Sequence, residues 1–378
     1  MAVAGRSLTI IPPELLEEIF FFACTDAGQT GCSINLVCKQ FRKHCIRTGV
    51  DIRQVYLCGP KALECFYCIL VLRELEGRKV VSLCMHADQA RPGKYLNGQE
   101  QAQCDASMVN ILRAISPDHL RLLYLKWPHS WSPHPMLPTT FPSLSELYVS
   151  GADISSSLQS GRALNLKILH IAHPARLTLD FGSFLAAVCP GITHLHLRST
   201  GIQCMEDDPI FLFMHSYRAS QKSLRSVTRT YTSNFLSPRT LIGGSAYAIP
   251  PEPLPLLSLR QLVISFPPLY VGGRGCGNGR KADREKVGLY WHVATGGKGI
   301  YHSDCTMVDG LEVEKSGRFN QVLRGDAGGR RLIVFPASED IPYHQLDGHR
   351  AKERATLKAE WLDRGTGVQS IARHWSGL

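Results

Sequence analysis

The hydrophobic positions in the first fifty residues predict two short amphipathic helices. The first begins near Pro12 and Pro13, since proline is tolerated in a first helical turn. Its apolar residues share one stripe at helical spacing, and they are Leu15, Leu16, Ile19, Phe20 and Ala23. A turn-rich segment over 25–31 precedes a second short helix, whose apolar residues are Ile34, Leu36, Val37 and Phe41. Helices of about ten residues cannot bury all their apolar surface alone, so one face packs either on the rest of the chain or on a partner.

The middle of the chain repeats the pattern L-x-x-L-x-L with aliphatic substitutions. Its clear copies start at Leu120, Leu144, Leu166, Ile192 and Leu259, and weak copies start at Val80 and Leu224. Successive copies are separated by 40, 24, 22, 26, 32 and 35 residues. The three central spacings fall within the 20–29 residues typical of leucine-rich repeats. Each copy is therefore predicted to supply one strand of a parallel sheet, with Phe181–Val188 forming a short helix between strands.

The positions between the leucines are expected to face outward, on the concave side of such an array. These positions are Tyr124, Glu146, Tyr148, His170, His194, His196 and Gln261. A mixed surface that carries aromatic residues suits protein recognition, so the first six are the candidate substrate-binding residues. The alternative is that they are exposed strand positions without a specific role.

Composition and charge argue against a disordered chain, a nucleic-acid-binding protein and a membrane-spanning protein. The chain has 378 residues with 44% hydrophobic and 20% charged residues, which argues against wholesale disorder. The net charge of +10 divides into +6 over 1–269 and +4 over 270–378, so no basic cluster favours nucleic-acid binding. The longest apolar run, Cys65–Leu72, is far shorter than the roughly 20 residues of a membrane span. Thirteen irregularly spaced cysteines and no recognisable signal peptide predict reduced thiols in the cytoplasm or nucleus.

No motif in the chain predicts catalysis, a cofactor or a metal site. The C-x-x-C pair Cys65 and Cys68 lies in an apolar helix predicted over 61–75, and buried inert thiols are expected there. A metal site at His194 and His196 would need two or three more ligands, and the sequence identifies none, so both residues are expected to be exposed. The glycine-rich run 272–279 is not followed by G-K-[ST], which indicates a flexible linker. Neither G-x-S-x-G nor H-E-x-x-H occurs, so the chain is not expected to be an enzyme.

The segment 271–329 differs from its surroundings in composition. It holds 14 glycines in 59 positions, whereas the other 319 residues hold 19. A strand is predicted after it at Arg331–Phe335, followed by a charged amphipathic helix over His349–Leu362. We interpret the segment as a disordered insertion, such as a translated intron, with a natural flexible loop as the alternative.

The N-terminal residues resemble the F-box, in particular the F-box-like segments of fungal proteins. The resemblance covers about 40 residues and is carried by Pro12-x-Glu14-Leu15-Leu16-x-x-Ile19-Phe20 and by Leu36-Val37-Cys38-Lys39-x-Phe41-Arg42. Ile11, Cys38 and Phe41 stand where the family has leucine, serine and tryptophan, and the loop Thr25–Cys32 is longer than usual. The C-terminal residues Arg331–Pro336 and Glu360-Trp361-Leu362-Asp363-Arg364 are similar to the ending of such fungal chains.

This resemblance implies an adaptor role without chemistry in the chain itself. F-box segments bind the Skp-type adaptor of a cullin–RING ubiquitin ligase, and the rest of the chain selects a protein substrate. The adaptor-binding residues it implies are Ile11, Pro12, Leu15, Leu16, Ile19, Phe20, Leu36, Val37 and Phe41. Holding a target near a ubiquitin-loaded enzyme would act by raising effective concentration.

The combined prediction is an α/β protein with four parts. They are a short α-helical F-box-like segment over 8–48, an irregular leucine-rich-repeat solenoid over 49–269, a Gly-rich insert over 270–329, and a C-terminal strand and charged helix over 330–378. The alternative function is a leucine-rich-repeat interaction scaffold that does not engage a ligase.

Overall fold

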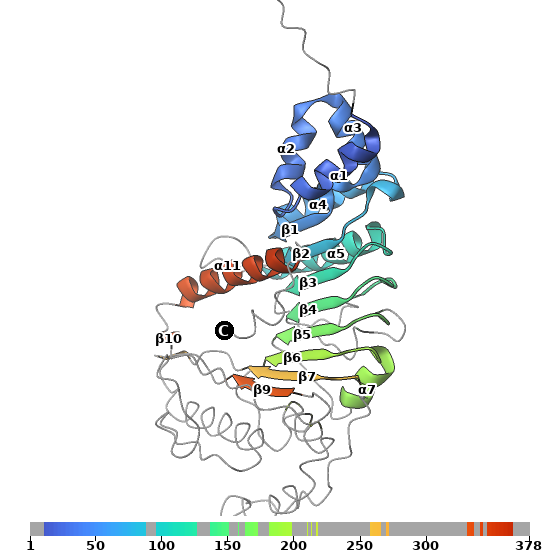
Figure 1. Ribbon diagram of the computed structural model, residues 1–378. Coiled ribbons are helices and arrows are strands. Elements are labelled where there is room, and N and C mark those ends of the chain that lie inside the picture. Colours follow the sequence, from blue (N-terminus) through green and yellow to red (C-terminus); the bar gives the residue numbers. More distant parts are fainter. Residues whose placement is uncertain are drawn as a thin grey trace, which may run out of the picture.

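The protein has a mixed α/β fold built around one parallel sheet (Figure 1). The computed structural model describes residues 11–87, 96–126, 137–150, 163–172, 181–198, 258–265, 270–271, 331–335, 341–342 and 346–365, together with positions 158, 210, 213 and 217. No helix within these ranges is both long enough and apolar enough to cross a bilayer.

The sheet has eight strands that follow one another in chain order, and every neighbouring pair is parallel. The strands are β1 (Gln54–Cys58), β2 (Ser82–His86), β3 (Leu122–Lys126), β4 (Glu146–Ser150), β5 (Ile168–Ala172), β6 (His194–Arg198), β7 (Gln261–Ser265) and β9 (Arg331–Phe335). The short strands β8 (Tyr270–Val271) and β10 (Ile341–Pro342) pair separately, also in parallel. The predicted strand at 331–335 is therefore confirmed.

The repeated leucines form the core because alternate strand residues point to the same face of a sheet. Two rows of aligned residues, starting at Val55 and Leu57 of β1, consist almost entirely of Leu, Ile, Val and Met and are buried from β1 to β7. Each copy predicted between 80 and 264 contributes its strand as expected, except the weak copy at Leu224, which lies outside the described residues. A further copy, Ile52-x-x-Val55-x-Leu57, accounts for β1.

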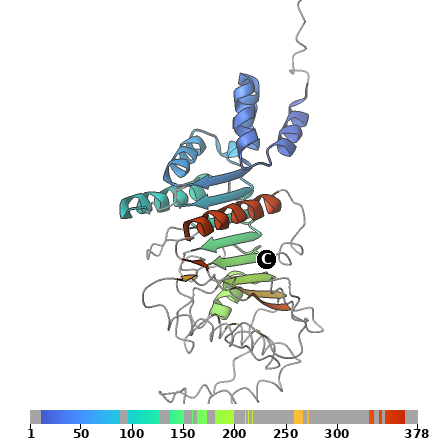
Figure 2. The ribbon, with the colours of Figure 1, turned by 90° about the vertical axis from the view of Figure 1, so that its left-hand side faces the viewer.

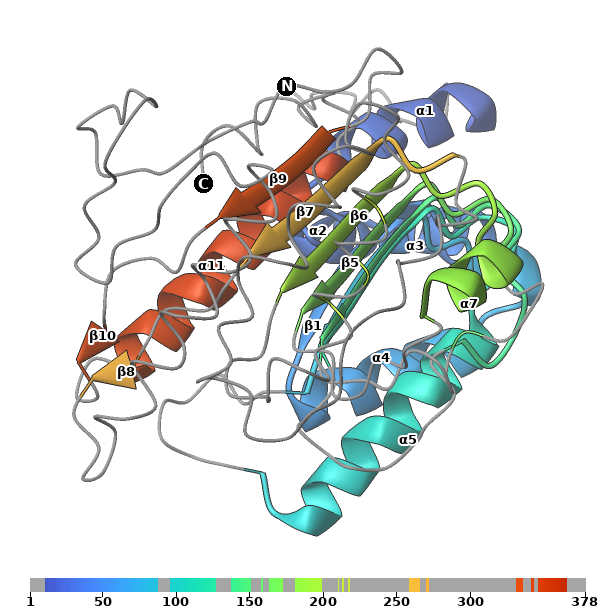
Figure 3. The ribbon, with the colours of Figure 1, turned by 90° about the horizontal axis from the view of Figure 1, so that it is seen from below.

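Helices that connect the parallel strands cover the leucine face. They are α4 (Pro60–Val71), α5 (Gly98–Ala114) and α7 (Phe181–Val188). The 3-10 turn η3 (Leu75–Gly77) follows α4. Parallel neighbours require crossover connections, and Figure 3 shows all three helices on the same side of the sheet. The helix predicted at 181–188 is confirmed. α5 begins with a capping box in which Asn97 and Glu100 each accept a hydrogen bond from the other's backbone N–H.

The N-terminal part contains three helices, so the predicted pair of helices was wrong. They are α1 (Pro13–Ala23), α2 (Gln29–Val37) and α3 (Lys39–Thr48), followed by the 3-10 turn η2 (Val50–Ile52). The helical conformation is interrupted at Cys38, between α2 and α3. The backbone of Cys38 is extended, and its Sγ accepts a hydrogen bond from the Phe41 N–H. Cys38 thus caps α3, and the turn predicted over 25–31 ends early because α2 begins at Gln29. We call residues 11–52 the head; it lies at the β1 end of the sheet (Figure 1).

The C-terminal helix crosses to the other side of the sheet. α11 (Leu346–Gly365) includes the predicted range 349–362 and extends beyond it at both ends. It lies on the face opposite α4, α5 and α7, in front of the N-terminal strands in Figure 2. Of the segment predicted as an insertion, Val271 belongs to β8 and the rest lies outside the described residues.

Candidate interaction surfaces

The head has a small hydrophobic core of its own. Leu16 and Phe20 of α1 pack with Ile34 of α2 and with Cys24, Cys45 and Val50. The Phe20 ring lies edge-on to Phe41, with the ring centroids 5.0 Å apart. Ile11 and Phe41 are partly buried against this cluster. Four of the nine residues that the F-box resemblance assigned to adaptor binding, Ile11, Leu16, Phe20 and Phe41, therefore contribute to holding the head together.

The other assigned residues are exposed, and four of the five are large and apolar. Pro12 precedes α1, Leu15 and Ile19 lie on α1 with 52% exposure each, and Leu36 and Val37 end α2 with 87% and 62%. Phe22, which was not among the predicted residues, is 75% exposed. Leu15, Ile19 and Phe22 follow one another at i, i+4 and i+7, so they share one side of α1. We call Leu15, Ile19, Phe22, Leu36 and Val37 the head stripe.

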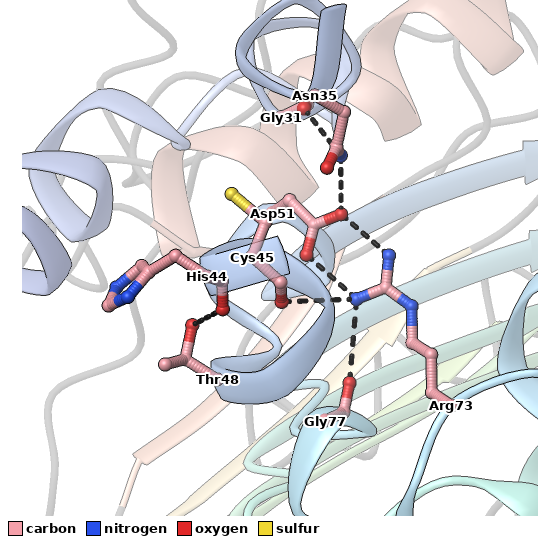
Figure 4. Close-up of polar contacts among 8 residues, drawn as sticks. All are labelled: Gly31, Asn35, His44, Cys45, Thr48, Asp51, Arg73 and Gly77. Atoms are coloured by element: carbon pink, nitrogen blue, oxygen red, sulfur yellow. Dashed lines mark hydrogen bonds and ion pairs between the residues drawn. The ribbon is translucent and has the colours of Figure 1, made fainter. Parts of the chain in front are cut away.

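A buried ion pair joins the head to the sheet (Figure 4). Arg73, which follows α4, donates from Nη1 to Asp51 Oδ1 at 2.8 Å and from Nη2 to Oδ2 at 2.6 Å. Asn35 of α2 donates to the same Asp51 Oδ2 at 2.7 Å. Both charged side chains are nearly inaccessible to solvent, so two charge-assisted hydrogen bonds fix the head in one orientation. Sequence patterns did not reveal this pair, because its residues share no motif.

Two glycines allow close backbone contacts around the ion pair, one within the head and one between the head and η3. A Cβ at Gly31 would collide with the Asp51 backbone carbonyl, and a Cβ at Gly77 would collide with the Ile46 carbonyl. Both positions lie next to the ion pair, where backbone meets backbone. Only glycine leaves room there.

The face of the sheet opposite the leucines carries a row of aligned aromatic and small residues. We call this row the aromatic face; it contains Tyr56, Cys84, Tyr124, Tyr148, His170 and His196. Neighbouring rings contact one another: Tyr124 stacks on Tyr148 at 4.8 Å, and His170 stacks on His196 at 3.9 Å between centroids. The parallel register places equivalent residues of successive strands side by side, which produces this stacking.

Helix α11 covers the N-terminal part of the aromatic face. Its Leu357 and Trp361 form one buried cluster with Tyr124 and Tyr148, and Trp361 has no exposed surface. Arg364 of α11 donates to Glu146 of β4 at 2.9 Å. Lys358 lies 5.0 Å from the Tyr56 ring centroid, within the range of a cation–π contact.

The prediction that the candidate substrate residues are openly exposed was therefore wrong. Tyr124, Tyr148 and His196 are buried, whereas Glu146, His170 and His194 are partly buried. The tyrosines lie under α11 and against each other's rings, and His196 stacks on His170. The structure does bring all six residues to the same face of neighbouring strands.

Burial lowers the pKa of two histidines on this face, His194 and His196. Burial, with smaller contributions from Arg198 and Arg364, lowers the pKa of His196 to about 3. Burial likewise lowers the pKa of His194, with Arg260 as the next cause. His196 Nε2 lies 2.7 Å from Ser265 Oγ, but an imidazole with so low a pKa is a poor general base at neutral pH. Within the described ranges, no group of three or more His, Cys, Asp or Glu side chains could hold a metal ion.

The C-x-x-C pair is exposed, so the prediction of buried thiols was wrong. α4 turns Leu63, Phe66 and Leu70 toward the core. Cys65 and Cys68 fall between these positions on the helix and point to solvent. Because a continuous apolar run has no preferred face, its periodicity could not distinguish the buried side.

Alkylation of the folded protein is expected to separate two groups of cysteines. Among the cysteines that the structure describes, the exposed ones are Cys32, Cys38, Cys65 and Cys68. The buried ones are Cys24, Cys45, Cys84, Cys104 and Cys189. Burial raises the pKa of Cys45 and of Cys189 to about 12. At pH 8 these thiols are therefore protonated, and the reagent cannot reach them. Iodoacetamide followed by peptide mass spectrometry should modify the exposed group at least about tenfold faster. In denatured protein the two groups should react at equal rates. Equal rates for the two groups in native protein would contradict the described burial.

Comparison with known proteins assigns no family to this chain. No family model matches it in a scan of protein families, and no curated protein matches it in a sequence search. Its function therefore has to be inferred from its own residues and their arrangement.

Proposed function

We propose that this protein is a non-catalytic substrate-recognition subunit that links a protein target to a Skp–cullin–RING ubiquitin ligase through an F-box-like head. The observation that carries the proposal is the head stripe. Leu15, Ile19, Leu36 and Val37 are large apolar residues that remain exposed, and each stands at a position that the F-box resemblance assigns to the adaptor. Large apolar side chains left exposed along one side of a helix, as Leu15, Ile19 and Phe22 are on α1, are typical of a protein-binding surface.

The rest of the chain supports the recognition half of the proposal. The L-x-x-L-x-L copies each correspond to one strand, and the strands follow in chain order, as expected for a leucine-rich-repeat solenoid. Such arrays commonly present extended binding surfaces. The ion pair between Asp51 and Arg73 would hold the adaptor-binding head at a constant position relative to that surface. The target would then be presented to the ligase at a high effective concentration.

A double substitution in the head stripe tests the proposal. Leu15→Asp combined with Ile19→Asp puts two carboxylates into the apolar surface, where docking would have to desolvate them. Binding of the full chain to a purified Skp-type adaptor, measured by calorimetry, is expected to weaken by roughly 100-fold or more, because substitutions in a central apolar anchor have such effects. Neither side chain belongs to the buried core of the head, so the circular dichroism spectrum should stay unchanged.

The matched control is Ile69→Asp combined with Leu72→Asp. Both residues are exposed and apolar at the end of α4 or just after it, outside the head stripe. This control should bind the adaptor with wild-type affinity. If the wild-type chain does not bind the adaptor, or if both double variants bind equally well, the ligase link is excluded and an interaction scaffold remains.

A further inference from the structure

We propose that the aromatic face is a docking surface for an amphipathic helix carrying an aromatic and a basic residue, and that α11 is its intramolecular occupant, which a partner helix must displace. The role of this surface in substrate selection rests on the proposed function. The displacement itself involves neither the head stripe nor the adaptor, so it can be tested separately.

The way α11 is seated defines the chemistry of the helix that fits. Leu357, Trp361 and Arg364 are spaced at i, i+4 and i+7, which places them along one side of the helix. Trp361 supplies the aromatic anchor, with its ring centroid 6.0 Å from that of Tyr56. Arg364 supplies the charge, because its partner Glu146 has a side chain that is only 20% exposed. A competing helix therefore needs an apolar residue, an aromatic residue four positions later and a basic residue three positions after that.

The contacts of α11 are separate from the main core. The large cluster that joins the leucine rows to α4, α5 and α7 includes none of the α11 residues whose side chains the structure describes. Leu357 and Trp361 belong instead to the smaller cluster on the aromatic face. The strand pairings involve backbone groups of the strands alone. Displacing α11 would therefore leave the sheet and its leucine core in place.

The fit between α11 and the sheet is incomplete. Within the described part of the chain, Trp361 Nε1, Gln54 Oε1 and Ser82 Oγ are buried without a hydrogen-bond partner. Each of these groups would bond to water if the two surfaces separated, so the closed arrangement loses part of its stability. The end of α11 is also crowded, since a Cβ at Gly365 would lie 2.5 Å from Gln54 Nε2. These features are those of an occupant that a better-fitting helix can replace.

Intramolecular occupancy sets the apparent affinity for a partner. A tethered helix competes at a high effective concentration. The affinity measured for an external helix is therefore the intrinsic affinity multiplied by the fraction of molecules in which the face is open. Substitutions that weaken the seating of α11 should raise that fraction and strengthen the binding of an external helix.

The test uses a fluorescent synthetic peptide with the sequence of residues 346–365 and the full-length chain. Fluorescence anisotropy should show weak binding to wild type and at least about tenfold tighter binding to Trp361→Ala and to Gly365→Val. The matched control is Gly98→Val, because a Cβ at Gly98 meets nothing within 4 Å. It should behave as wild type. Charge reversal at Glu146→Arg in the opened chain should weaken the peptide about tenfold, and a peptide carrying Arg364→Glu should recover binding.

Two results would overturn the proposal. One is that the peptide binds the opened variants no better than wild type. The other is that α11 proves to be a fixed part of the fold. In that case Trp361→Ala and Gly365→Val would lose the circular dichroism of the sheet, and in wild type the amides of 346–365 would exchange with deuterium as slowly as those of β2–β5. The proposal predicts a retained sheet and faster exchange in α11.

Discussion

Replacing Arg73 with methionine is expected to lower the free energy of unfolding by roughly 3–5 kcal/mol. The substitution keeps an unbranched apolar stem but removes the guanidinium, which leaves the Asp51 carboxylate buried with Asn35 as its remaining hydrogen-bond donor among the contacts of Figure 4. Burying a charge without its counter-charge is the costly case, because no water replaces the lost partner. A typical domain is stable by only about 5–15 kcal/mol, so this loss is large. Urea unfolding followed by circular dichroism would measure it as a shift in midpoint.

The matched control for this prediction is Arg47→Met. Arg47 is an exposed arginine of α3, in the same head, and its loss should change stability by no more than about 0.5 kcal/mol. The double variant Asp51→Leu with Arg73→Met should recover part of the loss, since both charges are removed together. Equal midpoints for Arg73→Met and Arg47→Met would show that the ion pair does not hold the head in place.

Acidification below pH 6.5 is expected to destabilise the protein through its buried histidines. Burial is the main cause that lowers the pKa of His196 to about 3, and it also lowers the pKa of His44, His119 and His194. The unfolded chain binds protons at these imidazoles near pH 6.5, whereas folded His196 binds its proton only near pH 3. The stability contributed by a lowered pKa is therefore present above pH 6.5 and is lost as the pH falls toward 3. For His196 alone, the loss would reach at most roughly 4 to 5 kcal/mol.

The variant His196→Gln isolates this contribution. Its free energy of unfolding at pH 7 should be lower than that of wild type, because the contact with Ser265 and the stacking on His170 change. Between pH 6.5 and 4, however, its stability should fall less steeply, since one titrating group is gone. Denaturation series at closely spaced pH values give both slopes. Parallel slopes for the two proteins would mean that His196 titrates normally in the folded state.

The parts of the fold that were predictable are those that depend on local periodicity. The leucine spacing located the strands β2–β7, because each strand must place the same alternate residues in the core. It also applied to β1 through Ile52, Val55 and Leu57, a copy that could have been found by extending the pattern toward the N-terminus. α5 was missed although Asn97 and Glu100 form a capping-box signature.

The parts that were not predictable depend on contacts between distant segments. Arg364 and Glu146 are 218 residues apart in sequence, so nothing local indicated that α11 covers the aromatic face. The exposure expected for Tyr124 and Tyr148 was wrong for the same reason. Arg73 and Asp51 meet because the head folds back against the end of α4, an arrangement that is set by tertiary packing rather than by propensity.

The head stripe was predictable in part. The helical spacing of α1 identified its apolar residues, but two adjacent stripes were merged, with Leu16 and Phe20 inside and Leu15 and Ile19 outside. Phe22 is one of the most exposed large apolar residues of the head, and it extends the outer stripe by one turn. The F-box resemblance did not include it, because the quoted motif ends at Phe20.

Hydrogen–deuterium exchange of the full chain with and without a Skp-type adaptor would show whether the head binds that adaptor. If the head binds the adaptor, exchange should be slower over 13–23 and 29–37, the helices that carry the head stripe, and unchanged over α5 at 98–114. Unchanged exchange in both head helices at saturating adaptor, or protection confined to the sheet, would contradict it.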